Sequence, residues 1–411
     1  MEEKKLVPKL RFPGFTEPWE QRKLGDIATI TGGGTPSTNI SEYWNGDIDW
    51  YSPVEIGENR YVSGSTRKIT KLGLEKSSAK ILPVGTVLFT SRAGIGNTAI
   101  LQVEGCTNQG FQSITPNSKA LDTYFLYTMT PKLKRYGEVT GAGSTFVEVS
   151  GKQMEQMNLM IPSLEEQKCV SQLFKAMDDT ITLHQRKLEH LKLKKKSLLQ
   201  KLFPKEGEVY PELRFPGFTD PWEQCKLCQI TTRVTRKNGG QSDLPLTISA
   251  QDGLVDQRKY FNRQVASRDM SNYYLIKKGE FAYNKSYSEG YPFGAVKRLD
   301  YYDIGALSTL YILFEITDNN ISSDFIVSYY MTHLWYKEIS KRAAEGARNH
   351  GLLNISTEDF FDSELNIPNS IEEQIKIGNF IKQFDKFITL HQRKLEHLQL
   401  LKKALLQQLF V

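Results

Sequence analysis

Two long stretches of the chain carry apolar residues at the spacing of a coiled-coil helix. From Met177 the steps between apolar positions alternate between four and three residues, and the same steps recur from Phe384. This heptad spacing places one row of side chains against a partner helix. The predicted seam consists of Met177, Ile181, His184, Leu188, Leu191, Lys195, Leu198 and Leu202, and of Phe384, Ile388, His391, Leu395, Leu398, Lys402, Leu405 and Leu409.

Both stretches begin with the same signals for a helix start. Pro162-Ser163 comes before Glu165, Glu166 and Gln167, and Pro368-Asn369-Ser370 comes before Glu372 and Glu373. A breaker, a capping hydroxyl and acids in the first turn are typical of a helix N-terminus. A helix of about 39 residues would be about 58 Å long. Because one helix cannot bury its seam alone, we expect the two helices to pair, antiparallel to each other. The seam histidines, His184 and His391, are expected to fix the register.

The helices belong to a tandem duplication of the chain. Residues 10–27 and 213–230 agree at 14 of 18 positions, and residues 165–203 and 372–410 agree at 24 of 39 positions. The first repeat, R-F-P-G-F-T-x-P-W-E-Q, contains two prolines and three aromatic residues, which predicts an extended segment anchored by its rings. We expect it to dock onto the helices or the following globular segment; stacking on nucleic-acid bases is the alternative.

Two inserts that show little similarity to each other separate the repeats. Both have short β-like runs and one helical stretch, near 121–136 and 323–344, and both are predicted to be mixed α+β. The predicted strands are Ile48–Tyr51, Thr86–Thr90, Thr98–Val103 and Gln112–Thr115, then Leu244–Ser249, Gly279–Tyr283 and Tyr311–Ile316.

The predicted fold class is therefore α+β: two globular mixed α/β units separated by two long antiparallel coiled-coil helices, an internal tandem repeat with pseudo-two-fold symmetry. The predicted organisation is an N-terminal repeated segment at 1–27, a first globular domain at 28–160, a central helix at 161–204, a linker with the repeated motif at 205–230, a second globular domain at 231–366 and a C-terminal helix at 367–411.

Composition fits a globular protein of two to three domains. Of the 411 residues, 39% are hydrophobic and 24% are charged. No apolar run approaches the roughly 20 residues that span a bilayer, and the first residues lack the apolar core of a signal peptide. Four cysteines do not form a disulfide framework. We therefore expect a cytoplasmic protein that has no membrane partner.

The net charge of +6 is a weak argument for nucleic acid, but its distribution is uneven. Between Arg186 and Lys205 there are eight basic residues and one acid, Glu189. Such a run is either a solvated helix face or a stripe that faces phosphates or a partner.

Several loops of the inserts are rich in groups that donate and accept hydrogen bonds. Arg reads guanine, and Asn or Gln reads adenine, in the major groove of DNA; Lys, Ser, Thr and backbone N–H groups suit phosphates. An ordinary surface loop is the alternative for any one of these residues, but the set favours recognition. The candidate DNA contacts are Thr31, Gly33, Thr35, Ser37, Thr38, Ser91, Arg92, Asn97, Asn108, Gln109, Ser144 and Thr145 in the first insert, and Arg233, Arg236, Lys237, Asn238, Asn284, Lys285, Ser286, Tyr287, Arg348, Asn349 and His350 in the second.

The sequence lacks the motifs of an enzyme or a metal protein. It has no G-x-x-x-x-G-K-[ST] phosphate loop and no Asn/Asp-Pro-Pro-aromatic run of an amino-methyltransferase. Cys225 and Cys228 form a C-x-x-C, but zinc needs a second ligand pair, and the first repeat has Arg22 and Gly25 at these positions. We expect no catalytic residue, no metal and no cofactor bound by this chain.

This layout resembles the specificity subunit of Type I restriction-modification systems over essentially the whole chain. The resemblance rests on the twin P-x-x-E-E-Q openings (the second with one extra residue), the twin L-H-Q-R-K-L-E-H-L helices and the twin R-F-P-G-F motifs. It also rests on T-G-G-G-T-P-S and L-F-T-S-R-A-G-I-G-N-T-A-I in the first insert. The second insert departs from the pattern, since Asn284–Gly290 keeps only its general form.

The resemblance implies a mechanism. Each insert would be a target recognition domain that reads one half of a bipartite, asymmetric site on double-stranded DNA, and the helices would set the gap. Two methyltransferase subunits would carry S-adenosylmethionine, and two restriction/translocase subunits would use ATP and Mg. The rival hypotheses are a nuclease or methyltransferase with diverged catalytic motifs, and a coiled-coil scaffold that does not bind DNA.

Overall fold

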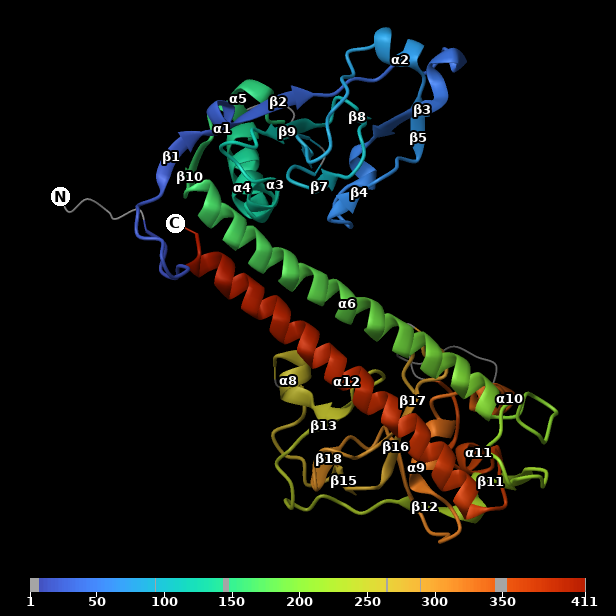
Figure 1. Ribbon diagram of the computed structural model, residues 1–411. Coiled ribbons are helices and arrows are strands. Elements are labelled where there is room, and N and C mark those ends of the chain that lie inside the picture. The colour runs from blue at the N-terminus through green and yellow to red at the C-terminus, as the bar shows by residue number, and fades with distance from the viewer. Residues whose placement is uncertain are drawn as a thin grey trace. The chain divides into compact units, whose positions relative to one another are not determined.

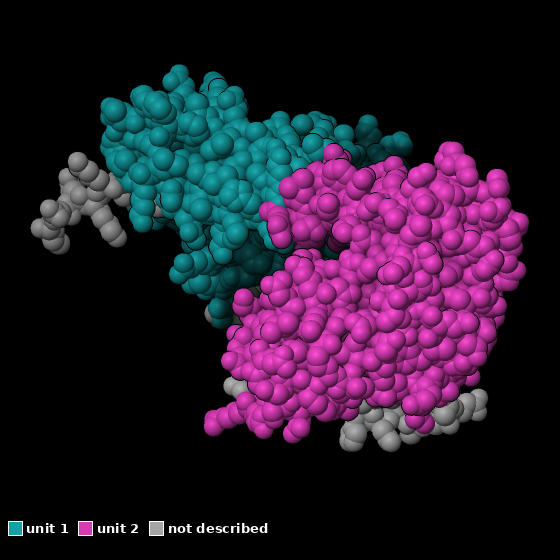
Figure 2. All heavy atoms as spheres, turned by 90° about the horizontal axis from the view of Figure 1, so that it is seen from below, with its two compact units in different colours: residues 1–185, 394–411 teal, residues 186–393 magenta. Residues whose placement is uncertain are grey.

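The computed structural model describes residues 7–92, 94–142, 148–263, 265–288, 290–343 and 353–410. The chain forms two compact units, which Figure 2 shows in different colours. Unit 1 comprises residues 1–185 and 394–411, and unit 2 comprises residues 186–393. Each unit therefore contains one insert together with a part of both long helices.

The two predicted long helices are α6 (Leu164–Leu202) and α12 (Ile371–Gln408), the longest ribbons in Figure 1. Both begin where the sequence predicts. The Ser163 hydroxyl accepts a hydrogen bond from the backbone N–H of Glu166 at 3.4 Å, and the Ser370 hydroxyl accepts one from Glu373 at 3.3 Å. These bonds satisfy backbone donors that have no partner inside the helix.

The helices pair with each other in an antiparallel sense, as predicted. In unit 1 the beginning of α6 meets the end of α12, where Lys402 Nζ lies 2.5 Å from Asp178 Oδ1. In unit 2 the end of α6 meets the beginning of α12, where Lys195 Nζ lies 2.5 Å from Asp385 Oδ1. The two pairs occupy equivalent positions of the repeat, with Asp178 equivalent to Asp385 and Lys195 equivalent to Lys402.

Burial along the helices follows the predicted heptad pattern. All of the predicted seam positions are buried or half-buried, including His184 and His391. Several apolar residues between seam positions are instead exposed, whereas Leu199 is buried. Leu183 and its repeat equivalent Leu390 are 64% and 60% exposed, and Leu193 and Leu400 are 68% and 66% exposed.

The repeated aromatic motif docks onto the helices and the insert, which confirms its predicted structural role. Both repeats hold their arginine in a two-bond ion pair, Arg11 with Glu166 and Arg214 with Glu373, with all four N···O distances at 2.8 Å. Their tryptophans are 2% exposed. The ring neighbours of Trp19 are Phe125 and Phe410, and those of Trp222 are Phe203 and Phe325. Rings packed in this way are not available to stack on bases.

The hydrogen bonds of the glutamine in the E-E-Q opening explain why both copies of the repeat keep this residue. Gln167 accepts a hydrogen bond from the backbone N–H of Asp122 and donates to the carbonyl oxygens of Ala120 and Pro162, at 2.9–3.0 Å. Gln374 makes the same three bonds in unit 2, with Ser322, Asn320 and Pro368. One side chain therefore ties each insert to the start of its helix.

Although the inserts differ in sequence, both are built on the same antiparallel sheet. The strand order is β2-β9-β6-β7-β4 in unit 1 and β12-β19-β16-β17 in unit 2. Among these neighbours only β4 pairs parallel, with β7. The unit 1 strands are β2 (Ala28–Gly32), β4 (Tyr61–Val62), β6 (Val87–Phe89), β7 (Thr98–Leu101) and β9 (Gln112–Pro116); the unit 2 strands are β12 (Thr231–Val234), β16 (Phe281–Asn284), β17 (Ala295–Arg298) and β19 (Ile312–Ile316).

Smaller sheets and short helices complete each unit. Unit 1 adds β1 (Glu20–Lys23) paired with β10 (Asn158–Ile161), a sheet of β3 (Trp44–Tyr51), β5 (Arg67–Ile69) and β8 (Cys106–Thr107), and helices α1 (Leu24–Ile27), α2 (Lys71–Glu75), α3 (Thr123–Thr128), α4 (Thr130–Gly141) and α5 (Gly151–Glu155). The short 3-10 turns are η1 (Ser41–Tyr43) and η2 (Pro53–Glu55). Unit 2 adds the pairs β11 (Glu223–Lys226) with β20 (Glu364–Ile367), β13 (Leu246–Ser249) with β14 (Gly253–Asp256) and β15 (Tyr274–Lys277) with β18 (Ile304–Leu307), and helices α7 (Leu227–Ile230), α8 (Gln257–Phe261), α9 (Ser323–Tyr329), α10 (Leu334–Arg342) and α11 (Thr357–Phe361).

The predicted strands are confirmed, but each predicted helical stretch is two helices rather than one. In unit 1 the chain breaks at Met129 between α3 and α4, and in unit 2 it breaks between α9 and α10. The Thr128 hydroxyl donates to the carbonyl oxygen of Phe125 at 2.6 Å, and Thr332 makes the same bond to Tyr329. The hydroxyl groups thus bond to backbone carbonyl oxygens that would accept hydrogen bonds from backbone N–H groups if the helix continued.

Candidate nucleic-acid interface

The candidate residues of unit 1 collect at one edge of its main sheet. Strand β2 ends where β9 begins, with Gly32 opposite Gln112, and the chain after β6 meets the same edge through a bridge between Thr90 and Phe111. The loops that follow or precede these strands therefore emerge together. We call residues 32–38, 90–92, 94–97 and 107–111 the unit 1 loop cluster.

Hydrogen bonds join the three loops of this cluster. Gly34 N donates to Thr107 O and Ser91 N donates to Gly110 O, both at 2.8 Å. The Thr35 hydroxyl donates to Oε1 of Gln109. The loops form one connected surface as a result, with Thr35, Arg92, Asn108 and Gln109 brought close together from separate parts of the sequence.

A second set of bonds fixes the loop that carries Arg92. The Thr90 hydroxyl donates to Gly94 O at 2.7 Å and accepts from the backbone N–H of Asn97 at 2.9 Å. Gly94 and Gly96 have φ values of +107° and +92°, which L side chains rarely adopt. The hydroxyl and the two glycines close the chain into a tight hairpin.

Not every sequence-predicted residue of unit 1 is placed for contact. Ser91 is completely buried, which corrects its place among the candidate contacts. Gly33 lies against Asn108 O, where an added Cβ would come within 2.0 Å. The absence of a side chain at Gly33 therefore allows the two backbone segments to approach each other closely. Ser37, Thr38 and Asn97 are exposed, and Thr31 is half-buried on β2. Ser144 and Thr145 lie outside the described residues.

The same sheet edge in unit 2 presents an equivalent cluster, which we call the unit 2 loop cluster (residues 235–238, 284–288 and 308–311). The chain leaves the sheet after Val234 and after Asn284 and re-enters it at Ile312. Leu310 N donates to Ser308 Oγ at 3.4 Å, as Gly110 N donates to Asn108 Oδ1 at 2.8 Å in unit 1. The turn that precedes β9 in unit 1 therefore recurs before β19 in unit 2, with different side chains.

Three predicted contacts of unit 2 have internal roles. Asn238 is 1% exposed and bonds to Ser242 of its own loop and to the carbonyl oxygen of Met270, which corrects its assignment. Arg236 pairs with Glu280 at 2.6 Å, and Lys285 Nζ donates to the carbonyl oxygen of residue 355 at 3.3 Å. The remaining candidates are open to solvent or half-buried: Arg233, Lys237, Asn284, Ser286 and Tyr287. Of these, Lys237 also donates from Nζ to the carbonyl oxygen of Asn272 at 2.9 Å. Arg348, Asn349 and His350 lie outside the described residues.

Sequence reasoning missed Ser308, Thr309 and Leu310. They occupy the position in unit 2 that Asn108, Gln109 and Gly110 occupy in unit 1, and Leu310 is 62% exposed. Their only signal was their place just before a predicted strand. The equivalence became visible once the register of both sheets was known.

Two acidic groups beside the unit 1 loop cluster are held in one protonation state. Burial raises the pKa of Tyr51 to about 12, and the charges of Asp49 and Glu55 add to the effect. Burial also acts to raise the pKa of Glu55, but hydrogen bonds from Thr66 and Ser52 outweigh it and lower that pKa. Near neutral pH the phenol is therefore neutral and the carboxylate is charged.

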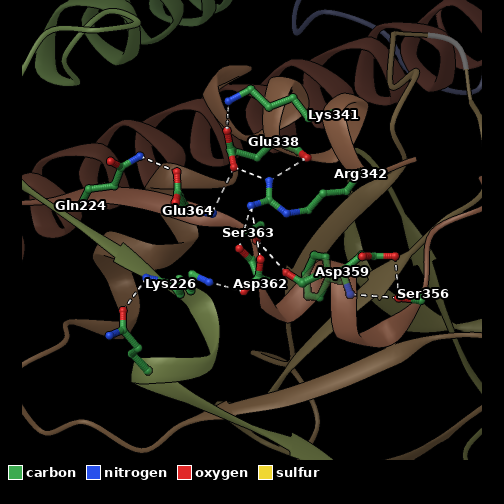
Figure 3. Close-up of polar contacts among 12 residues, drawn as sticks. Gln224, Lys226, Glu338, Lys341, Arg342, Ser356, Asp359, Asp362, Ser363 and Glu364 are labelled. Atoms are coloured by element: carbon green, nitrogen blue, oxygen red, sulfur yellow. Dashed lines mark hydrogen bonds and ion pairs between the residues drawn. The ribbon is translucent and has the colours of Figure 1, made fainter. Parts of the chain in front are cut away.

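A dense polar network in unit 2 joins α10 to neighbouring elements (Figure 3). Glu338 on α10 accepts hydrogen bonds from Lys341 and Arg342, and Arg342 also donates to the Asp362 carbonyl oxygen at 2.9 Å. Lys226 pairs with the Asp362 carboxylate at 2.5 Å. Each of these carboxylates has a cationic partner, so the network ties α10 to α11 and to β11.

No metal centre is formed by the part of the chain that the structure describes, where no three His, Cys, Asp or Glu residues gather at ligand distance. All four cysteines are free thiols. Burial, with smaller effects of Asp318 and Cys228, raises the pKa of Cys225 to about 11. Among the described helices, none is both long and apolar enough for a bilayer.

The fold is that of solved Type I restriction-modification subunits. The structure is similar to the Type I restriction-modification system S subunit from M. genitalium, with a TM-score of 0.61, 13% identity and coverage of 98% of this chain and 99% of that chain. A chain from a study of complex assembly and conformational transition of the Type I R-M system gives a TM-score of 0.50 at 17% identity, with coverage of 98% and 99%.

The family model of the Type I restriction modification DNA specificity domain matches residues 16–193 and 259–400, more than half of the chain. The chain belongs to this family. It is 36% identical over 235 residues to the Type I restriction enzyme MjaIX specificity subunit of Methanocaldococcus jannaschii, covering 55% of this chain and 54% of that protein. It is 27% identical over 167 residues to the EcoR124I/EcoR124II specificity subunit of Escherichia coli, covering 39% and 41%. The match thus spans about half the length of these relatives.

Proposed function

We propose that this chain is the DNA sequence-recognition subunit of a Type I restriction-modification complex. The observation that carries the proposal is the pair of loop clusters: both units present the same edge of the same sheet, but with different side chains. Polar loops held by a rigid sheet suit the reading of base edges and phosphates.

Each unit would read one half of a bipartite site on double-stranded DNA. Two identical readers related by a two-fold axis would select a palindrome. Here the backbone arrangement is repeated but the side chains are not, so the two halves of the site would differ in sequence. The DNA target would be asymmetric as a result.

The long helices would set the spacer and dock two methyltransferase subunits. Helix α6 begins in unit 1 and ends in unit 2, and α12 does the reverse. The length of the helices would therefore contribute to the distance between the two units that read DNA. The exposed leucines at equivalent positions, Leu183 with Leu390 and Leu193 with Leu400, support docking of two like partners. Exposed apolar residues that recur with the symmetry of an assembly are suited to its interfaces.

The chemistry would reside on the partner subunits. The methyltransferase subunits would bind S-adenosylmethionine and modify adenine, and two restriction/translocase subunits would use ATP and Mg. The role of this chain would be to bind and orient the DNA, without a catalytic residue or cofactor of its own. The cytoplasm, where DNA and these cofactors are available, is the proposed location.

The test is a binding and methylation assay with the purified chain, alone and together with methyltransferase subunits. We expect salt-sensitive, sequence-selective binding by the complex, methylation of adenines in one bipartite sequence, and neither cleavage nor methylation by the chain alone. Binding without sequence preference would favour a scaffold. Activity of the chain alone would favour the enzyme hypothesis.

A further inference from the structure

Among the half-buried arginines that the structure describes in unit 1, one differs from the others in having no partner. Of the half-buried arginines that the structure describes there, Arg11, Arg22 and Arg60 each pair with an acidic residue. Arg92 is also half-buried, but among the described residues its guanidinium group has no hydrogen-bond or ion-pair partner. A positioned guanidinium group with five free donors is suited to an external acceptor.

The structure holds this arginine in place through its backbone. Arg92 forms a bridge with Glu148, and the neighbouring Ser91 is fixed between Gly110 and Val149 by bonds of 2.8 and 3.1 Å. The hairpin closed by Thr90 limits the loop further. A side chain carried on a fixed backbone loses less freedom on binding, which favours specific recognition.

Gln109 lies beside Arg92 in the loop cluster. The bond from Ser91 N to Gly110 O joins their two loops directly. Gly110 packs closely here, because an added Cβ would lie 2.8 Å from Pro53 and 3.0 Å from Asn108 Oδ1, with Arg92 Nε at 3.6 Å. Gln109 is exposed, and the Thr35 hydroxyl that donates to its Oε1 orients the carboxamide. The amide Nε2 stays available as a donor.

The equivalent positions of unit 2 carry different chemistry. Leu353 N donates to Lys285 O at 3.0 Å, as Val149 N donates to Ser91 O, so Lys285 corresponds to Ser91 and Ser286 corresponds to Arg92. By the turn described above, Thr309 corresponds to Gln109. The two units thus share a backbone frame but present a guanidinium and a carboxamide in one case, and two hydroxyls in the other.

From this arrangement we infer that Arg92 and Gln109 are specificity-determining residues of unit 1, which read a guanine and an adenine in the major groove. The inference rests on the proposed function. Arginine donates to O6 and N7 of guanine, and glutamine pairs with N6 and N7 of adenine. Loss of either side chain removes discrimination at one base pair, about 5- to 150-fold for a good two-bond contact.

The experiment measures methylation of a randomised DNA library by the complex of the full chain with methyltransferase subunits. We compare the wild type with Arg92→Ala, Arg92→Lys and Gln109→Ala. The matched controls are Arg135→Ala and Gln102→Ala, which change exposed residues of unit 1 outside the loop cluster. The expected result is relaxed preference at one base pair of a single half-site for each test variant, with the other half-site and both controls unchanged.

The lysine variant separates base reading from phosphate binding. Arg92→Lys keeps the charge but loses the planar two-donor geometry, so we expect relaxed base preference with little loss of overall affinity. Uniform weakening across all sequences in Arg92→Ala, with a smaller salt dependence, would identify a phosphate contact and overturn the inference. Unchanged half-sites in all three variants would also overturn it. Absence of a preferred sequence for the wild type would instead refute the proposed function.

Discussion

The ion pair between Arg11 and Glu166 offers a quantitative test of how the repeated motif holds unit 1 together. Two hydrogen bonds of 2.8 Å join the side chains, which are 11% and 2% exposed. The change Glu166→Gln keeps the shape but removes the charge and one acceptor. It leaves the guanidinium group partly buried without a counter-charge, which costs about 3–5 kcal/mol for a fully buried pair. Because some water reaches Arg11, we expect about 2–4 kcal/mol.

Amide hydrogen exchange measured by mass spectrometry is the suitable assay, because the chain has two units and a single unfolding midpoint is not defined for it. The expected loss corresponds to exchange about 30- to 900-fold faster for amides that open only when unit 1 unfolds. We expect these to include the amides of β6, which is buried at the centre of the main sheet of unit 1. The double change Arg11→Met with Glu166→Gln removes both charges, and we expect it to cost less than the sum of the single changes.

The repeat supplies the matched control in the same chain. Arg214 and Glu373 form the same pair in unit 2, with side chains 15% and 1% exposed. We expect Glu373→Gln to accelerate exchange in unit 2 and to leave unit 1 unchanged. If Glu166→Gln changed exchange less than threefold, or accelerated both units equally, the assignment of this pair as the anchor of unit 1 would be wrong.

Three further predictions address the helices and the pH dependence. Lys402→Met leaves the Asp178 carboxylate, which is 14% exposed, without its cation; we expect a loss of about 1–2 kcal/mol in unit 1, measured by hydrogen exchange, and equal exchange in wild type and variant would refute it. Burial raises the pKa of Glu338, but its bonds to Lys341 and Arg342 outweigh this and lower the pKa below its ordinary 4.5. Its contribution is therefore present above about pH 4.5 and lost as the pH falls through the lowered value; hydrogen exchange of unit 2 between pH 3 and 7, corrected for the intrinsic pH dependence of exchange, should show a shallower acid loss of stability for Glu338→Gln, and an identical loss would contradict this. Adding one heptad to both helices lengthens each by about 10 Å, and methylation mapping should show half-sites farther apart by up to about three base pairs; an unchanged gap would defeat the role of the helices as a spacer.

The sequence alone determined the repeated framework of this protein. Heptad spacing is a local property of a helix, so the seam from Met177 and its copy from Phe384 could be predicted without coordinates. The helix starts at Ser163 and Ser370 follow from capping chemistry, which involves residues three positions apart. Features that depend on near neighbours in the chain can be read directly from it.

Only the tertiary structure decided how the loop clusters are composed. Thr35, Arg92 and Gln109 are far apart in sequence, and the register of β2, β6 and β9 brings them to one edge. The same register revealed Thr309 as the counterpart of Gln109, although the inserts show little sequence similarity. It also showed that Asn238 is used inside its own loop. Burial and strand register depend on contacts between residues that are distant in sequence. Backbone hydrogen bonds between the strands fix the positions of the loops, whereas the side chains that the loops carry are free to differ.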